Sequence, residues 1–111
     1  MAYVYCMIFI ETPVFTDDVL DALSDDEYSE FQKALSLDPE LGDLIPGGGG
    51  LRKVRWSMPG KGKRGGVRVI YYWAVSKDLV YLLLLYKKAR QENLTPDQLA
   101  VLRRLVKGEL K

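Results

Sequence analysis

Apolar and polar residues alternate with two different periodicities along this chain, one typical of strands and one typical of helices. Runs rich in β-branched, aromatic and other apolar residues occur in four places, each bounded by turn-forming residues. Residues 80–86 are apolar or aromatic at every position, as expected of a central strand that is buried on both faces. We therefore predict strands at residues 3–10, 51–57, 67–75 and 79–86.

Three other segments combine a helix start signal with apolar residues at helical spacing. Thr16 precedes two aspartates and is placed to cap a short helix. Ser24 with Glu27, and Thr95 with Gln98, have the spacing of capping boxes, in which each side chain bonds to the backbone of the other residue. The predicted helices cover residues 16–23, 25–37 and 96–107.

The element order is β-α-α-β-β-β-α, and the last three strands are joined by short connections. Short connections favour antiparallel pairing, because parallel neighbours need a crossover of a dozen or more residues. We predict an α+β fold in which a small antiparallel β-sheet has its helices packed on one face. With 111 residues, the chain has the length of one domain, residues 1–111.

Composition excludes several classes of protein. The longest apolar runs are too short to cross a bilayer, and residues 1–10 lack the basic start of a signal peptide. The single cysteine, Cys6, excludes an internal disulfide, and the absence of histidine makes a structural zinc site very unfavourable. We expect a cytoplasmic protein with no membrane segment, no metal and no cofactor, in which Cys6 is a small buried apolar residue.

Charge is distributed very unevenly. Residues 1–50 carry eleven acidic residues and one basic residue, whereas residues 51–90 carry eleven basic residues and one acidic residue. The formal net charge of the whole chain is nevertheless only +1. Such segregation predicts a polyanionic partner for the basic part. The alternative is that the two segments face each other in the fold and neutralise each other.

The basic residues concentrate in residues 51–73, which contain seven cations and no acidic residue. Period two places Lys53 and Arg55 on one face of the first strand, and Arg68 begins the next strand. The loop between these strands adds Lys61, Lys63 and Arg64. If the strands form a hairpin, the cations converge near one end of the sheet, where they repel one another unless an anion binds. The following strand ends with further cations, Lys87, Lys88 and Arg90.

Each of these signals also has a structural interpretation. Lysines and arginines on an edge hairpin protect it from aggregation, although seven exceed what that role needs. Tyr71, Tyr72 and Trp73 can stack on bases, but aromatic residues in a strand more often belong to the core. The segment 60–65 satisfies G-x-G-x-x-G, yet it joins two strands instead of opening a helix, so a dinucleotide site is excluded.

The order and spacing of several pieces resemble the RelE/HigB-type toxins of bacterial toxin–antitoxin systems. These pieces are L-D-P-E-L-G-D-L-I-P-G at 37–47, L-R-K-V-R at 51–55 and G-K-R-G-G-V-R-V-I-Y-Y at 62–72. The resemblance covers most of residues 24–107. It implies a RelE-like fold and a ribosome-dependent endoribonuclease that cleaves mRNA in the ribosomal A site, inhibits translation and is silenced by a cognate antitoxin.

The resemblance also implies roles for individual residues. Lys53 and Arg55 match the paired basic residues that contact the scissile region, and Arg68 matches the arginine that stabilises the phosphate. Lys88, or its neighbour Lys87, stands where RelE-type enzymes carry a further catalytic arginine. The residues expected to hold RNA are Arg52, Lys61, Lys63, Arg64 and Arg90. Leu94 replaces a tyrosine of RelE, so base stacking is unassigned, and Tyr86 is a weak substitute.

Cleavage without metal requires the RNA 2′-hydroxyl to attack the adjacent phosphate, with groups that accept and donate protons and stabilise the charged intermediate. Arginine suits charge stabilisation, and lysines are the candidates for proton transfer because the chain has no histidine. The expected partners are the ribosome, mRNA and a helix-turn-helix, HigA-like antitoxin, through which alone the protein would reach operator DNA. Two alternatives remain, namely a gyrase inhibitor of the same superfamily and a non-catalytic RNA-binding module.

Overall fold

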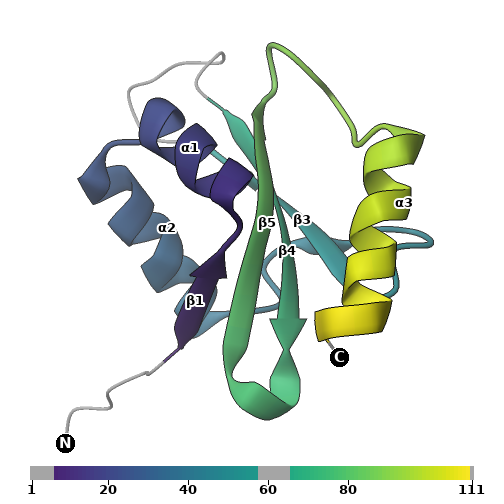
Figure 1. Ribbon diagram of the computed structural model, residues 1–111. Coiled ribbons are helices and arrows are strands. Elements are labelled where there is room, and N and C mark those ends of the chain that lie inside the picture. The colour runs from purple at the N-terminus through teal and green to yellow at the C-terminus, as the bar shows by residue number, and fades with distance from the viewer. Residues whose placement is uncertain (1–6, 58–65, 111) are drawn as a thin grey trace, which may run out of the picture.

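Five strands and three α-helices make up the described part of the chain, which in this computed structural model is residues 7–57 and 66–110 (Figure 1). The strands form one mixed sheet in the order β1-β5-β4-β3-β2. They are β1 (Ile8–Glu11), β2 (Asp43–Leu44), β3 (Leu51–Trp56), β4 (Val67–Ala74) and β5 (Leu79–Lys87). The helices are α1 (Pro13–Ala22), α2 (Asp25–Leu37) and α3 (Pro96–Leu105), and a π-helical turn, Val106–Leu110, follows α3. The predicted α+β fold class is confirmed.

Local sequence signals set two of the three helix starts as predicted. Both capping boxes, at Ser24 and at Thr95, are present with reciprocal hydrogen bonds. The predicted start of the first helix at Thr16 is wrong, because α1 begins one turn earlier. Thr12 is its N-cap and Pro13 its first residue, where the fixed φ of proline suits a helix and its missing N–H costs nothing.

The sequence predicted an antiparallel sheet, but the observed sheet is mixed. The pairs β2–β3, β3–β4 and β4–β5 are antiparallel, but β1 lies parallel to β5 at the edge of the sheet. The crossover between these two parallel strands runs through α1, α2 and the other strands, so it is far longer than the minimum that parallel pairing needs. The two-residue strand β2 is too short to show a sequence pattern and was not predicted.

Helices cover both faces of the sheet, which corrects the prediction that they pack on one face. Phe15 of α1 and Phe31 of α2 lie in a buried cluster with Val69 and Tyr71 of β4. On the other face, Ile70 of β4 belongs to a second cluster, against which α3 packs. Figure 1 shows α1 and α2 on one side of β5 and α3 on the other. Because β4 and β5 are apolar on both faces, each face needs its own cover.

The turn that leads into β3 is fixed by buried contacts. The Tyr71 hydroxyl donates to the Pro39 carbonyl (2.7 Å) and accepts from the Gly42 amide (2.9 Å), which anchors the segment before β2. Gly50 has φ +113°, and a Cβ there would lie 2.9 Å from the Tyr72 ring, so only glycine fits. Tyr71 is fully buried, as the core interpretation predicted.

Among the described residues, none of the helices has the length and apolar character needed to span a membrane.

Candidate functional site

Strand β3 displays two of its three cations, Lys53 and Arg55, on the α3 side of the sheet. Val54 and Trp56 turn to the cluster under α1 and α2, so Lys53 and Arg55 face the opposite way, as period two predicts. In the antiparallel pairing of β3 with β4, Arg55 lies directly opposite Arg68. The three residues that the sequence placed on two separate strands therefore share one face of the sheet.

A row of three residues crosses the sheet at this point. Arg68 is flanked by Arg55 on β3 and by Tyr86 on β5. Directly opposite residues have Cβ atoms about 4.5–5.5 Å apart, and like charges so placed destabilise a sheet. Arg68 is nevertheless only 8% exposed. A buried arginine beside a second arginine is a cost to the fold, which a bound anion would reverse.

Tyr86 is the third residue of the row, and its hydroxyl is buried. The residue is 8% exposed, and its hydroxyl oxygen has no hydrogen-bond partner within the described residues. Burial raises the pKa of Tyr86, while the positive charges of Arg68 and Arg55 act in the opposite direction. The phenol therefore remains protonated at neutral pH, as a donor that lies beside two guanidinium groups.

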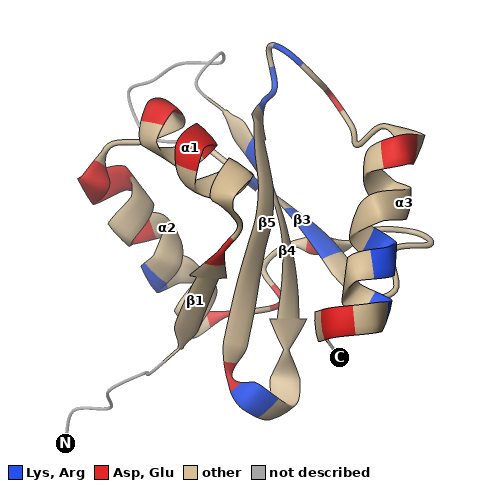
Figure 2. Ribbon diagram, viewed as in Figure 1, with Lys and Arg blue, Asp and Glu red and all other residues tan. Residues whose placement is uncertain are grey.

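The acidic half of the sequence does not neutralise this cluster. Figure 2 shows acidic residues gathered on α1 and α2, away from the basic positions of β3. Within the described ranges, the ion pairs that join the two halves are Arg52 with Glu40 and Lys87 with Asp21, both at 3.5 Å. Lys53, Arg55 and Arg68 take part in neither pair. The alternative of mutual neutralisation therefore does not apply to these three cations.

A pocket of about 560 Å³ lies beside Lys53 and Arg55. Its wall on the other side is formed by the β2 turn, by Leu94 of the segment that leads into α3 and by Leu99 of α3 itself. β2 pairs with only two residues of β3, so the outer half of β3 borders this pocket directly. The pocket thus combines an apolar floor with cations on its rim, which is a suitable environment for one unstacked base with its phosphate.

Comparison with known families agrees with this arrangement. Residues 21–111 match the family model of the RelE toxin of the RelE/RelB toxin–antitoxin system. The chain belongs to the RelE toxin family. It is a toxin of a toxin–antitoxin system, and membership implies a cognate antitoxin. The family is known for endoribonuclease toxins.

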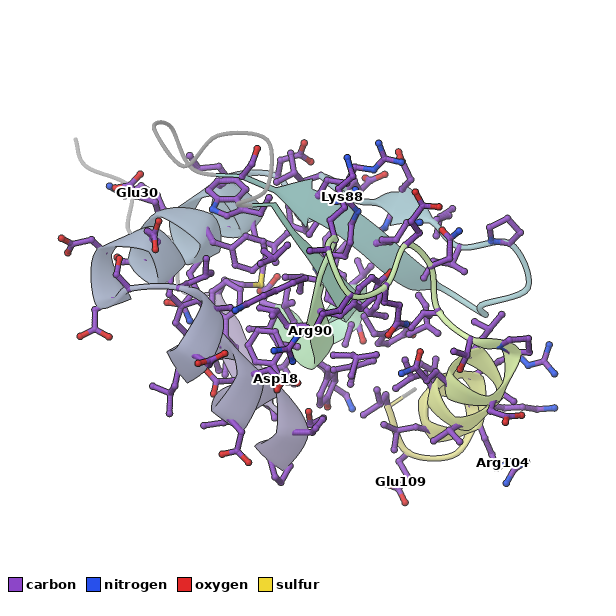
Figure 3. All side chains as sticks on the ribbon, turned by 90° about the horizontal axis from the view of Figure 1, so that it is seen from above. Asp18, Glu30, Lys88, Arg90, Arg104 and Glu109 are labelled. Atoms are coloured by element: carbon purple, nitrogen blue, oxygen red, sulfur yellow. The ribbon has the colours of Figure 1, made fainter. Side chains whose placement is uncertain are left out.

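The remaining predicted site residues of the toxin divide between the two faces of the sheet. The Lys88 amide donates to the Gly66 carbonyl (3.2 Å), which places Lys88 next to the start of β4. Lys87 points to the α1 side, where its ammonium pairs with Asp21. Figure 3 shows Arg90 near Asp18, away from Lys88, and both Asp18 and Arg90 line a second pocket on the α1 side. The structure therefore brings Lys88, but not Lys87 or Arg90, toward the Arg55–Arg68 pair.

In the toxin, the Arg52 side chain contacts other parts of the protein and supports the fold. Its guanidinium donates to the Gly42 carbonyl (2.8 Å) and pairs with Glu40, so it holds the segment before β2 against the sheet. It lies on the α2 side of β3, opposite to Lys53. Four other residues named by the sequence lie outside the described residues, namely Cys6, Lys61, Lys63 and Arg64.

Sequence reasoning missed one residue that contacts the site. The Lys53 ammonium donates to Asn93 Oδ1 at 3.0 Å, although the two residues lie 40 positions apart. The only sequence signal was a polar run, residues 91–93, between the last strand and the last helix. Such a run is equally typical of an ordinary loop. Leu94, which stands in place of the tyrosine of RelE, lines the pocket next to Asn93.

Proposed function

We propose that this toxin is a HigB-like, ribosome-dependent endoribonuclease that cleaves mRNA in the A site without a metal ion. The observation that carries the proposal is the Arg55–Arg68 pair with Lys53 on the same face, without a carboxylate partner among the described residues and beside an open pocket. A fold gains nothing from such a cluster, whereas a ribose-phosphate chain matches it in charge and in hydrogen-bond geometry.

The chemistry follows from the groups that are present. The 2′-oxygen of the RNA attacks the adjacent phosphorus, the bond from phosphorus to the 5′-oxygen breaks, and the products are a 2′,3′-cyclic phosphate and a 5′-hydroxyl. Lys53 is the candidate to accept the proton of the 2′-hydroxyl, and Lys88 the candidate to donate one to the 5′-oxygen. Arg55 and Arg68 stabilise the charge that develops on the phosphorane oxygens. The ribosome aligns the substrate, so that positioning supplies much of the rate.

The proposed setting is the cytoplasm, where ribosomes and mRNA are found. The partner that silences the toxin is a helix-turn-helix antitoxin of the HigA type, and contact with operator DNA passes through that antitoxin alone. The direct test is the neighbouring open reading frame. Its product should bind the toxin and restore growth to cells that express it, and a product that does neither contradicts this part of the proposal.

Primer extension on mRNA bound to purified ribosomes tests the nuclease activity. We expect cuts in the A-site codon that require ribosomes, with no cuts in free mRNA. Gyrase inhibition without cuts would replace the proposal with the gyrase alternative. Binding to RNA with neither effect would identify a non-catalytic RNA-binding module.

A further inference from the structure

The contact between Lys53 and Asn93 is chemically directional. An ammonium group has donors and no acceptor, so the Asn93 oxygen must face Lys53 and the Asn93 amide nitrogen must turn away. Asn93 is therefore a neutral acceptor that holds the end of a flexible lysine side chain. This single hydrogen bond fixes the position of the lysine nitrogen beside the pocket.

Asn93 is itself held in place by neighbouring side chains. Gln91 donates to the Asn93 carbonyl (2.8 Å) and to Gln98 Oε1 (2.7 Å), so both protons of its amide have partners. Gln98 Oε1 also accepts from the Thr95 amide (3.0 Å) as part of the capping box of α3. The loop that carries Asn93 is thus tied to the first turn of the helix.

Helix α3 in turn packs against the sheet. Leu94, Leu99 and Leu102 pack against the buried cluster that contains Leu51 of β3 and Ile70 of β4. Lys53 lies on the same strand as Leu51, two residues further on. Asn93 is therefore linked to β3 in two ways, directly through Lys53 and indirectly through α3. Both links restrain the loop that carries Asn93.

A competing partner for Lys53 lies on the neighbouring strand. Asp43 of β2 is directly opposite Lys53 in the β2–β3 register and lines the same pocket. A carboxylate there would favour the charged form of the lysine and compensate its charge. Within the described residues, however, Lys53 makes no ion pair with Asp43, and its Nζ donates to the neutral Asn93 amide instead.

We propose that Asn93 is a positioning residue that holds Lys53 toward the RNA and away from Asp43. The inference rests on the proposed nuclease function, in which Lys53 takes part directly. It assigns to the segment between β5 and α3 a role in the site that charge alone does not indicate.

The test measures kcat and KM for A-site cleavage in three variants and in one further control variant. We expect Asn93→Ala to lower kcat about tenfold, the effect of one hydrogen bond to a charged group, with KM and thermal stability unchanged. Asp43→Asn alone is the single-variant reference for the double variant. Asp43→Asn combined with Asn93→Ala should recover most of the lost kcat, because the competing carboxylate is gone. Glu92→Ala, an exposed neighbour, is the matched control and should behave as wild type.

Two results would overturn the inference. One is an Asn93→Ala variant with the kcat of wild type, and the other is a loss that Asp43→Asn does not restore. The NMR signal of the Lys53 ammonium gives a readout that does not need cleavage. Its proton exchange should quicken in Asn93→Ala, and an unchanged signal would contradict the positioning role. If the wild type cleaves nothing while this signal changes as expected, the nuclease proposal fails and the positioning of Lys53 stands.

Discussion

Arg55 of β3 and Arg68 of β4 lie directly opposite each other on one face of the sheet. Neither forms an ion pair within the described part of the chain, and Arg68 is 8% exposed. Both guanidinium groups stay charged at any physiological pH. This pair is therefore a built-in electrostatic cost, and it indicates that the fold is selected for binding an anion at this position.

Removal of Arg68 should abolish most of the nuclease activity. We expect Arg68→Ala to lower kcat about 100-fold, the usual effect of losing one preorganised donor to a developing anion. The measurement is ribosome-dependent cleavage followed by primer extension. Arg104→Ala is the control, because Arg104 is an exposed cation on α3 and outside the row (Figure 3). Equal activity of the two variants would contradict the role of Arg68.

Replacement of the same arginine by an apolar residue should stabilise the protein. Arg68→Met removes a buried charge but keeps much of the side-chain volume, so we expect the free energy of unfolding to rise by about 1–2 kcal/mol. Urea denaturation measures the change, and Arg104→Met should show none. A less stable Arg68→Met variant would mean that the arginine supports the fold in another way.

Two buried tyrosine hydroxyls should have opposite effects on stability. Tyr71→Phe leaves the Gly42 amide and the Pro39 carbonyl without their partner, so we expect a loss of about 2 kcal/mol. Tyr86→Phe removes a hydroxyl that has no partner in the described residues, so we expect a gain of about 0.5–1 kcal/mol. Thermal unfolding measures both. Equal signs would show that one of the two environments is misassigned.

Arg52 should matter for folding more than for RNA. Arg52→Ala leaves the Gly42 carbonyl without its donor, so we expect a loss of about 1 kcal/mol in the free energy of unfolding. The cleavage rate should not change, since the guanidinium lies on the face opposite to Lys53. A variant with normal stability and weakened RNA binding would restore Arg52 to the RNA contacts that the resemblance implied.

Alkaline pH should weaken the fold through its buried tyrosines. Burial raises the pKa of Tyr71 and of Tyr86 above the ordinary value of 10.0. Above about pH 10 the unfolded chain loses these protons while the folded chain keeps them, so stability falls as the pH rises, by at most about 1.4 kcal/mol per pH unit for each tyrosine. Urea denaturation between about pH 9 and pH 11, roughly one unit either side of this value, measures the decline.

The control for the alkaline prediction is Tyr86→Phe. It removes one of the two groups, so its stability should fall less steeply with pH than that of the wild type. An identical pH dependence of the two proteins would exclude Tyr86 as a contributor. Stability that increases above pH 10, roughly the ordinary value for tyrosine, would contradict the sign of the whole effect.

The sequence by itself determined whatever depends on neighbours along the chain. The capping boxes at Ser24 and Thr95, the buried character of β5 and the shared face of Lys53 and Arg55 follow from spacing and backbone geometry. The family resemblance depends on short motifs of the same kind. It located the RelE fold and the three cations that the structure brings onto one face.

Only the tertiary structure decided which distant segments meet. The parallel pairing of β1, the position of α3 on the second face and the Lys53–Asn93 contact depend on register and packing between remote residues. The same holds for Lys87 and Lys88, which are adjacent in sequence: Lys87 ends β5 and pairs with Asp21 of α1, whereas Lys88 lies in the turn after β5 and its amide donates to Gly66. Local patterns specify the faces of each element, and burial against other elements specifies what each face contacts.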